Sequence, residues 1–439
     1  MLSVLRSPTY RRLFGAQAVA LTGTGLATVA LSLLAYELAG ANATAVLGTA
    51  LAIKMAAYVL IAPLVGALAD RVPRRALLVS MDLVRAAVVL ALPFVGRIWQ
   101  VYLLILLLQA ASAAFTPAFQ ATIPQVLPDE RDYTEALSLA RLAHDLESLV
   151  SPVLAVALLT VLPYSWLFAG TAAGFLASAV LVRSTALPPP APARPAPERA
   201  GGGGSRPRAG TKALSGVRLL LAAPRLRALL ALDLAVAAAG AVVLVDTVLL
   251  VRDTLGRPAG DVPLALGAYG AGSMAAALLL PRVLERCGDR AVMVRAALVL
   301  PGALGLLALG LAVPPGAWSW PALLAVWLIT GAAGSAVLTP GGRVVRRSVR
   351  AGDLPAAFAA RFSLSHACWL VTYPLAGLLA AAAGPAASAA ALTAVALAGA
   401  LGAALLWTEP ERDPGHRTGT AARQRGSRIS RPSRTTSRP

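Results

Sequence analysis

The sequence has few cysteine, histidine and charged residues. Two cysteines and three histidines occur in 439 residues, and charged residues make up 13% of the chain, against about 25% in soluble proteins. Cys287 lies in an arginine-rich turn and Cys368 in an apolar run, so a disulfide framework is excluded. No metal-ligand spacing and no nucleophile with a base can be assembled from these residues, which indicates a protein that is not an enzyme and has no cofactor or resident metal.

Basic residues exceed acidic ones, and the formal net charge is +19. The basic residues are spread over the turns between apolar runs and are not gathered into one patch with aromatic residues, which argues against a nucleic-acid partner. Apolar residues make up 57% of the chain, and its mean hydropathy is +0.71. We therefore predict an all-α protein that crosses a lipid bilayer many times.

Twelve apolar runs are each long enough to span a membrane, for which about 20 residues are needed. The first run follows three arginines and is too long for the core of a signal peptide, so we expect it to be a helix of the mature protein. The runs cover residues 13–37, 44–65, 76–96, 99–124, 134–161, 164–183, 228–251, 264–284, 291–313, 318–341, 354–382 and 386–407.

Two polar segments divide the chain. Residues 187–216 are rich in proline, then in glycine and arginine, which predicts a flexible cytoplasmic linker between one six-helix bundle in residues 1–186 and another in residues 217–407. Residues 408–439 are basic and lack periodicity, so we expect a disordered cytoplasmic tail. Contact of this tail with anionic lipid headgroups is the alternative.

The distribution of basic residues predicts the orientation. With a cytoplasmic N-terminus, all but four of the 39 lysines and arginines fall on or near the cytoplasmic side: Arg97, Arg252 and Arg257 fall outside, and Lys54 falls within the second run. Both termini are therefore expected in the cytoplasm. Aromatic residues at the helix ends predicted to be external agree with this orientation, because such rings favour the headgroup level: Trp99, Tyr102, Tyr164, Trp166, Trp318 and Trp320.

The two halves of the sequence carry a related turn. The motif Gly66-x3-Asp70-Arg71-x-Pro73-Arg74-Arg75 between runs two and three recurs as Pro281-x3-Glu285-Arg286-x-Gly288-Asp289-Arg290 between runs eight and nine. Similar charges at corresponding turns predict two bundles related by a parallel pseudo-two-fold axis. Twelve runs with this turn and a long central linker resemble the major facilitator superfamily (MFS) of transporters, and in particular its bacterial exporters of drugs and other small molecules.

The resemblance implies a conformational latch at the first turn. In the superfamily this aspartate faces the start of helix eleven, so Asp70 is expected to pair with the positive end of that helix while the cytoplasmic side is closed. Gly66, Arg71, Arg74 and Arg75 complete the expected latch. The alternative for the three arginines is that they only set the topology.

The fifth run holds the densest polar group. Arg141, His144 and Asp145 share one helical face with Ser148, and Glu147 lies beside them. In one interpretation, Arg141 and Asp145 neutralise each other and only pack the halves together. In the other, Asp145 or Glu147 takes up and releases the coupling proton, and His144 relays it.

Further polar residues within the runs are candidates for the wall of a substrate cavity. Lys54 lies close to the middle of the second run, where a charge is costly unless it faces a cavity. In the superfamily helices one, four, seven and ten line the cavity, which places Gln17, Gln109 and Asp246 on the wall, although one buried polar group more often makes a helix-packing hydrogen bond. His366 corresponds to His144 in the repeat, and the two could bind a proton or a metal together.

We therefore predict a monomeric secondary transporter of a bacterial plasma membrane that works by alternating access and exports a small molecule at the expense of protons. A divalent-metal exporter, an importer of the same fold, and a membrane sensor or assembly protein without transport activity are the alternatives. The sequence does not identify the substrate.

Overall fold

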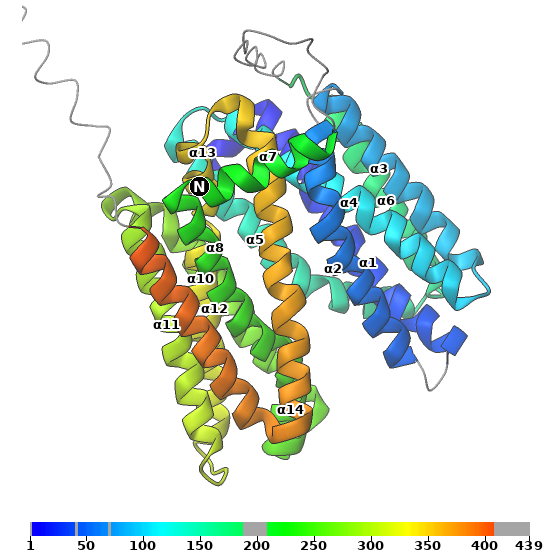
Figure 1. Ribbon diagram of the computed structural model, residues 1–439. Helices are drawn as coiled ribbons and strands as arrows, with labels where there is room; N and C mark the ends of the chain where they lie inside the picture. Colours follow the sequence, from blue (N-terminus) through cyan, green and yellow to red (C-terminus); the bar gives the residue numbers. More distant parts are fainter. Residues whose placement is uncertain (1, 40–42, 69–71, 188–208, 408–439) are drawn as a thin grey trace, which may run out of the picture. The chain divides into compact units, whose positions relative to one another are not determined.

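The structure, a computed structural model, describes residues 2–39, 43–68, 72–187 and 209–407 (Figure 1). Helices dominate these ranges, and no strand occurs in them. Eleven of the described helices are long and apolar enough to cross a membrane. The longest contains one residue with non-helical dihedral angles, Gly384, which divides it in two. The described helices thus provide twelve spans, as the sequence predicts.

The division within the longest helix, α14 (Leu354–Leu406), has a local cause. Gly384 has a φ of 85°, a conformation that favours glycine, and Pro385 directly follows it. Proline suits the first turn of a helix because it has no N–H that would need a partner there. We call residues 354–383 the first arm of α14 and residues 385–406 its second arm.

The N-terminal half contains six membrane-spanning helices. Small residues let two of them approach closely: the Cα of Gly23 on α1 lies 3.6 Å from where a Cβ at Gly174 on α6 would stand. In a membrane such small-residue contacts replace the hydrophobic drive for helix association. The half consists of η1 (Leu2–Arg6), α1 (Pro8–Ala39), α2 (Ala43–Leu68), α3 (Arg74–Ala91), η3 (Leu92–Phe94), α4 (Ile98–Val126), α5 (Glu130–Leu159) and α6 (Ser165–Arg183).

The C-terminal half begins with a span that changes helix type three times. Residues Pro224–Ala241 form α8, and π-helical stretches η4 (Val242–Asp246) and η5 (Leu250–Thr254) flank the short α9 (Thr247–Leu249). The other elements are η6 (Ala259–Asp261), α10 (Val262–Arg286), α11 (Asp289–Leu311), α12 (Ser319–Leu338), α13 (Gly341–Ser348), η7 (Ala351–Asp353) and α14. Isolated π-helical turns within α-helices are frequent at functional sites.

Two glycines bring α10 and α12 into backbone contact. A Cβ at Gly272 would collide with the carbonyl oxygen of Leu328, and a Cβ at Gly331 would collide with that of Tyr269. Both glycines are therefore required by the packing and not by their backbone angles.

A further helix, α7 (Ala209–Ala222), packs against α2, α8 and α14 (Figure 1). Its first eight residues fall where the sequence analysis places the end of the linker, so the chain is helical there. Residues 188–208 of the predicted linker and residues 408–439 of the predicted tail lie outside the described residues. The boundaries between bundle, linker and tail remain predictions.

Candidate functional site

A network of charged side chains joins the two halves at one end of the bundles. Glu130 begins α5 in the N-terminal half, and its Oε1 lies 3.3 Å from Nη2 of Arg343 and 2.5 Å from Nη2 of Arg347, both on α13. The same arginines contact Asp289, the first residue of α11, at 3.1 and 2.8 Å. We call Glu130, Asp289, Arg343 and Arg347 the inter-half network.

Neighbouring contacts extend this network. The side chain of Arg343 also donates to the hydroxyl of Thr134, and Arg346 donates to the carbonyl oxygens of Leu127 and Pro128. Arg131 pairs with Glu285 at 3.2 Å, although both side chains are largely exposed. The network is more protected than this pair, because Asp289 is 2% and Arg343 9% exposed, and Arg347 and Glu130 are 31% and 40% exposed. Ion pairs shielded in this way are screened less by salt than exposed ones.

The residues of the predicted latch lie in different surroundings. Asp70 and Arg71 are outside the described residues, and Gly66 lies near the end of α2. Arg74 is buried and donates to Gln125 of α4, so this contact stays within the N-terminal half, whereas Arg75 is exposed. The latch itself therefore stays a prediction.

The contacts that do cross the halves include the second copy of the turn motif. Glu285 pairs with Arg131 of the N-terminal half, whereas Asp289, which aligns with Arg74 in the repeat, contacts Arg343 and Arg347 within its own half. Sequence reasoning missed Arg343 and Arg347, because it counted them only as topology charges. The feature of the sequence that could have indicated this contact is the cluster of Arg343, Arg346 and Arg347 next to Gly341-Gly342.

A second contact between the halves lies deeper, on the polar face of α5. Nη2 of Arg141 lies 3.1 Å from Asp145 Oδ1, as the helical spacing predicts. Ser273 of α10 completes a triangle: Arg141 donates to its Oγ at 2.9 and 3.0 Å, and the Ser273 hydroxyl donates to Asp145 Oδ2 at 2.7 Å. Asp145 and Ser273 are both buried. The hydroxyl of Ser273 therefore connects the Arg141–Asp145 pair to the opposite half.

The other polar residues of α5 point elsewhere. His144 is exposed, and its Nε2 lies 3.5 Å from the amide nitrogen of Gln17 on α1. Glu147 and Ser151 border a groove of about 290 Å³ between α1 and α5. A Cβ at Gly25 of α1 would lie 2.8 Å from the Glu147 carboxylate, so the absence of a side chain there makes room for it.

A cavity of about 190 Å³ lies between the halves behind the inter-half network. Its polar wall includes Gln17, Arg141 and His144 from the N-terminal half and Arg361 from α14. Arg361 is held by Asp233 of α8 at 3.2 Å. We call this space the central cavity. It brings together three predicted residues and adds Arg361, which the sequence analysis did not single out.

Lys54, Gln109 and His366 meet around Tyr58, an aromatic residue of α2. The Tyr58 hydroxyl donates to Gln109 of α4 at 3.1 Å, and the Lys54 Nζ lies 5.8 Å from the Tyr58 ring centre. On the other side, the ring centres of Tyr58 and His366 are 4.8 Å apart. Phe362 packs on both rings at 5.0 and 4.2 Å. This group connects α2 and α4 of one half with α14 of the other.

Asp246 lies inside the C-terminal half, with 1% of its surface exposed. Ser388 of the second arm of α14 donates to its Oδ2 at 2.8 Å. This placement corresponds to the helix-packing alternative of the sequence analysis, and the residue does not line the central cavity described above.

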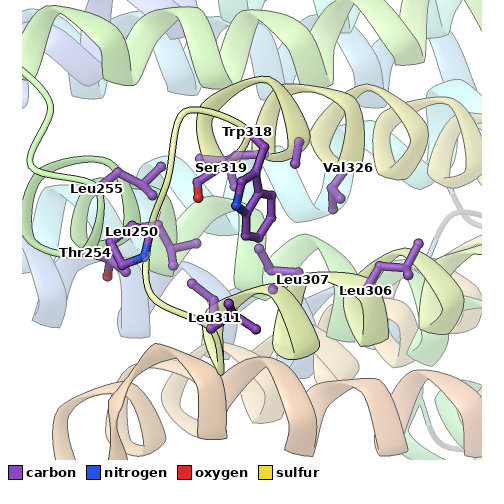
Figure 2. Close-up of a pocket in the computed structure, with 14 residues that line it drawn as sticks. Leu250, Thr254, Leu255, Leu306, Leu307, Leu311, Trp318, Ser319 and Val326 are labelled. Atoms are coloured by element: carbon purple, nitrogen blue, oxygen red, sulfur yellow. The ribbon is translucent and has the colours of Figure 1, made fainter.

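An apolar pocket of about 80 Å³ lies between η5, the end of α11 and the start of α12. Figure 2 shows the ring of Trp318 within it, near Leu307. Among the described residues, no charged side chain lines this pocket, in contrast to the central cavity. Its hydrogen-bonding side chains are those of Thr254, Trp318 and Ser319.

Comparison with known proteins identifies the family. The model of the Major Facilitator Superfamily matches residues 13–256 and 234–436, which together include most of the chain. The chain belongs to the major facilitator superfamily. The predicted twelve-helix MFS fold is confirmed, and the protein is an MFS transporter that crosses the membrane several times.

Solved structures of other MFS proteins have the same fold. The human organic anion transporter MFSD10 has a TM-score of 0.75 at 16% identity, covering 90% of this chain and 99% of that one. A bacterial homologue of the iron transporter ferroportin, in its outward-facing state, has a TM-score of 0.73 at 14% identity, covering 91% and 98%. The E. coli fucose:proton symporter FucP has a TM-score of 0.70 at 14% identity and the same coverage.

One curated relative is also similar in sequence. The uncharacterised MFS-type transporter YfiS of Bacillus subtilis (strain 168) is 26% identical over 124 residues. The match covers 28% of this chain and 30% of that protein, so the chain matches less than a third of its relative's length.

Proposed function

We propose that this MFS transporter is a proton-coupled exporter of a small molecule, with both termini in the cytoplasm of a bacterium. The orientation is supported by the basic residues, of which only Arg97, Arg252 and Arg257 fall on the external side. In this orientation the turns that carry the inter-half network face the cytoplasm. The described arrangement is then closed to the cytoplasm and outward-facing.

The inter-half network is the observation that carries the proposal. Alternating access requires contacts that hold one side closed and that can be exchanged as a unit when the halves rock. Two ion pairs meet this need, because they join Glu130 of α5 to Arg343 and Arg347 of α13 across the halves. Asp289 of α11 contacts the same two arginines within the C-terminal half. A protein with no conformational cycle would not require charged groups at this interface.

The triangle of Arg141, Asp145 and Ser273 supports coupling to protons. While Asp145 is ionised, it attracts Arg141 and accepts a hydrogen bond from the opposite half. A proton on Asp145 removes that attraction and weakens the contact with α10, so protonation and separation of the halves favour each other. Through its contact with Gln17, His144 offers a place for the relayed proton beside the cavity. Glu147 remains the second candidate carboxyl.

The central cavity supports a small substrate with a polar or charged group. Gln17, His144 and Arg361 present hydrogen-bonding groups to it, and Arg141 adds a second guanidinium. Export of a metal has less support from the geometry. Within the described ranges no three His, Cys, Asp or Glu side chains are placed to hold a metal ion. His144 contacts Gln17, whereas His366 packs on Tyr58 and Phe362.

A reconstituted system tests the proposal with a panel of substrate classes. The full-length protein is placed in liposomes that contain a pH-sensitive dye and is challenged with organic cations, organic anions and divalent metals. A substrate should move protons in the opposite direction to itself, and Asp145→Asn should abolish the proton signal while Asp253→Asn, at an exposed acid, should retain it. Substrate flux without any proton signal would refute the coupling. Flux in the same direction as protons would refute export.

A further inference from the structure

The buried carboxyl groups differ in whether a cation lies beside them. Five of the six buried acids in the described ranges lie within 3.8 Å of an arginine nitrogen, namely Asp82, Glu135, Asp145, Asp233 and Asp289. Asp246 is the sixth, and among the described residues it has no ion pair. A carboxylate buried in hydrocarbon without a cation is strongly disfavoured, and such a group becomes neutral instead.

The hydrogen bonds around Asp246 fit a neutral carboxylic acid. The Ser388 hydroxyl lies 2.8 Å from Asp246 Oδ2 and 3.2 Å from the carbonyl oxygen of Ala376. A hydroxyl has one hydrogen and cannot donate fully to both. If Asp246 carries a proton on Oδ2, it donates to Ser388, and Ser388 donates to Ala376. Both contacts are then satisfied.

The helices around Asp246 offer no charged group to neutralise it in the described ranges. Its own span carries Arg252 and Asp253 at the exposed end. In α10, Tyr269 is the one titratable residue before Arg282. In the part of α14 that follows Cys368, Tyr373 is the one titratable residue. The helix α12 has no ionisable side chain and reaches this region through Trp327, whose ring nitrogen donates to Thr247 at 2.9 Å.

We propose that Asp246 is a proton-binding site of the transport cycle, located in the C-terminal half and occupied by a proton in the described state. The inference rests on the proposed proton coupling and adds a site to it. Asp246 ends the π-helical stretch η4, and through Ser388 and Ala376 its proton links this stretch to both arms of α14.

The position of α14 explains how this proton affects the whole transporter. The first arm of α14 contacts the N-terminal half directly: the Ser363 hydroxyl donates to the carbonyl oxygen of Val59 on α2 at 2.5 Å. Loss of the proton leaves an unpaired carboxylate between η4 and α14. That charge is relieved only when the helices separate enough to admit water or a cation. Protonation of Asp246 therefore stabilises the described state, and deprotonation favours its opening.

The test measures conformation, so it needs no substrate. Ala76 at the start of α3 and Cys287 before α11 are exposed positions in opposite halves at the end of the bundles where the inter-half network lies. Spin labels at Ala76→Cys and native Cys287, with Cys368→Ser, report the distance between the halves in nanodiscs from pH 5 to pH 9. Asp246→Asn, which keeps a donor toward Ser388 but cannot ionise, is compared with the exposed Asp253→Asn.

At low pH the wild type, Asp253→Asn and Asp246→Asn should have the same distance, and as the pH rises the distance should become shorter in Asp246→Asn than in the other two. Titration of Asp145, which acts in the opposite direction, is common to all three proteins and cancels in this difference. Ser388→Ala retains the Asp246 carboxyl group and removes the hydrogen bond between Ser388 and Asp246. Because this hydrogen bond is stronger for the ionised carboxylate, the pH at the midpoint of the distance change should rise by about one unit. This second variant keeps the test decisive if Asp246→Asn does not fold. A distance in Asp246→Asn equal to that of the wild type at every pH would overturn the inference.

The liposome assay separates this inference from the proposed function. If Asp246→Asn exchanges substrate for protons as the wild type does, Asp246 is not a proton-binding site of the cycle, and the protein is still a proton-coupled exporter. If the wild type transports no member of the panel, the proposed function is refuted, and the pH response of the spin labels still tests the role of Asp246.

Discussion

Replacement of Arg343 by alanine should open the side of the transporter that carries the inter-half network. Arg343 is 9% exposed, contacts Glu130 at 3.3 Å and Asp289 at 3.1 Å, and donates to Thr134. Two of these contacts cross the halves. The hydrogen bond from the charged side chain to buried Thr134 contributes about 1.5–3 kcal/mol, and the pair with Glu130, whose side chain is 40% exposed, contributes about 0–1 kcal/mol. Because Arg347 still contacts both acids, we expect the closed state to lose about 2–3 kcal/mol, which corresponds to an increase in the open population of about 30- to 150-fold.

The accessibility of a buried position behind the network measures this change. Ser138 on α5 is 0% exposed, so a cysteine there should react with a maleimide only when the halves separate. With Cys287→Ser and Cys368→Ser as background, the rate of labelling of Ser138→Cys should rise in Arg343→Ala by the same factor as the open population.

Arg131 provides the matched control. Its pair with Glu285 also joins the two halves, at 3.2 Å, but the two side chains are 72% and 50% exposed. Exposed pairs contribute about 0–1 kcal/mol, so Arg131→Ala should change the labelling rate by less than about fivefold. If Arg343→Ala labels no faster than Arg131→Ala, the inter-half network does not hold the closed state.

Three further substitutions test the packing and the polar contacts. Gly272→Ala should lower the unfolding temperature, because the new Cβ would strike the backbone of α12 and such overpacking costs about 1–3 kcal/mol. The control Gly267→Ala has open space around its Cβ and should not lower it. Equal unfolding temperatures of the two variants would contradict the close packing of α10 and α12. Ser273→Ala should weaken the contact between the halves by about 1–1.5 kcal/mol, so Ser138→Cys should be labelled roughly tenfold faster. An unchanged labelling rate would show that the Ser273 hydroxyl does not stabilise the contact between the halves. Asp82→Asn leaves Arg85 buried without its ion pair, at a cost of about 3–5 kcal/mol, and should therefore reduce the yield of folded protein. An unchanged yield and an unchanged melting curve would refute this prediction.

The interior of α5 shows which part of the site follows from local sequence. Arg141 and Asp145 are four residues apart, so a helix alone places them together, and the structure confirms this contact. Glu147 is six residues beyond Arg141 and therefore lies about 240° around the helix, toward α1 instead of α10. The sequence analysis grouped it with the other charges, although its neighbours are different.

The twelve spans, their division into two halves and the break in α14 follow from the sequence alone, because each depends on the composition of neighbouring residues and on the cost of polar groups in hydrocarbon. The partners of the charged side chains emerge only from the packing of the folded chain. Ser273 reaches Asp145 across 128 residues, Arg343 reaches Glu130 across the linker, and Ser388 reaches Asp246 from the far arm of α14. Such pairs depend on how whole helices are rotated and packed against one another, and a single sequence has no local signal for that rotation.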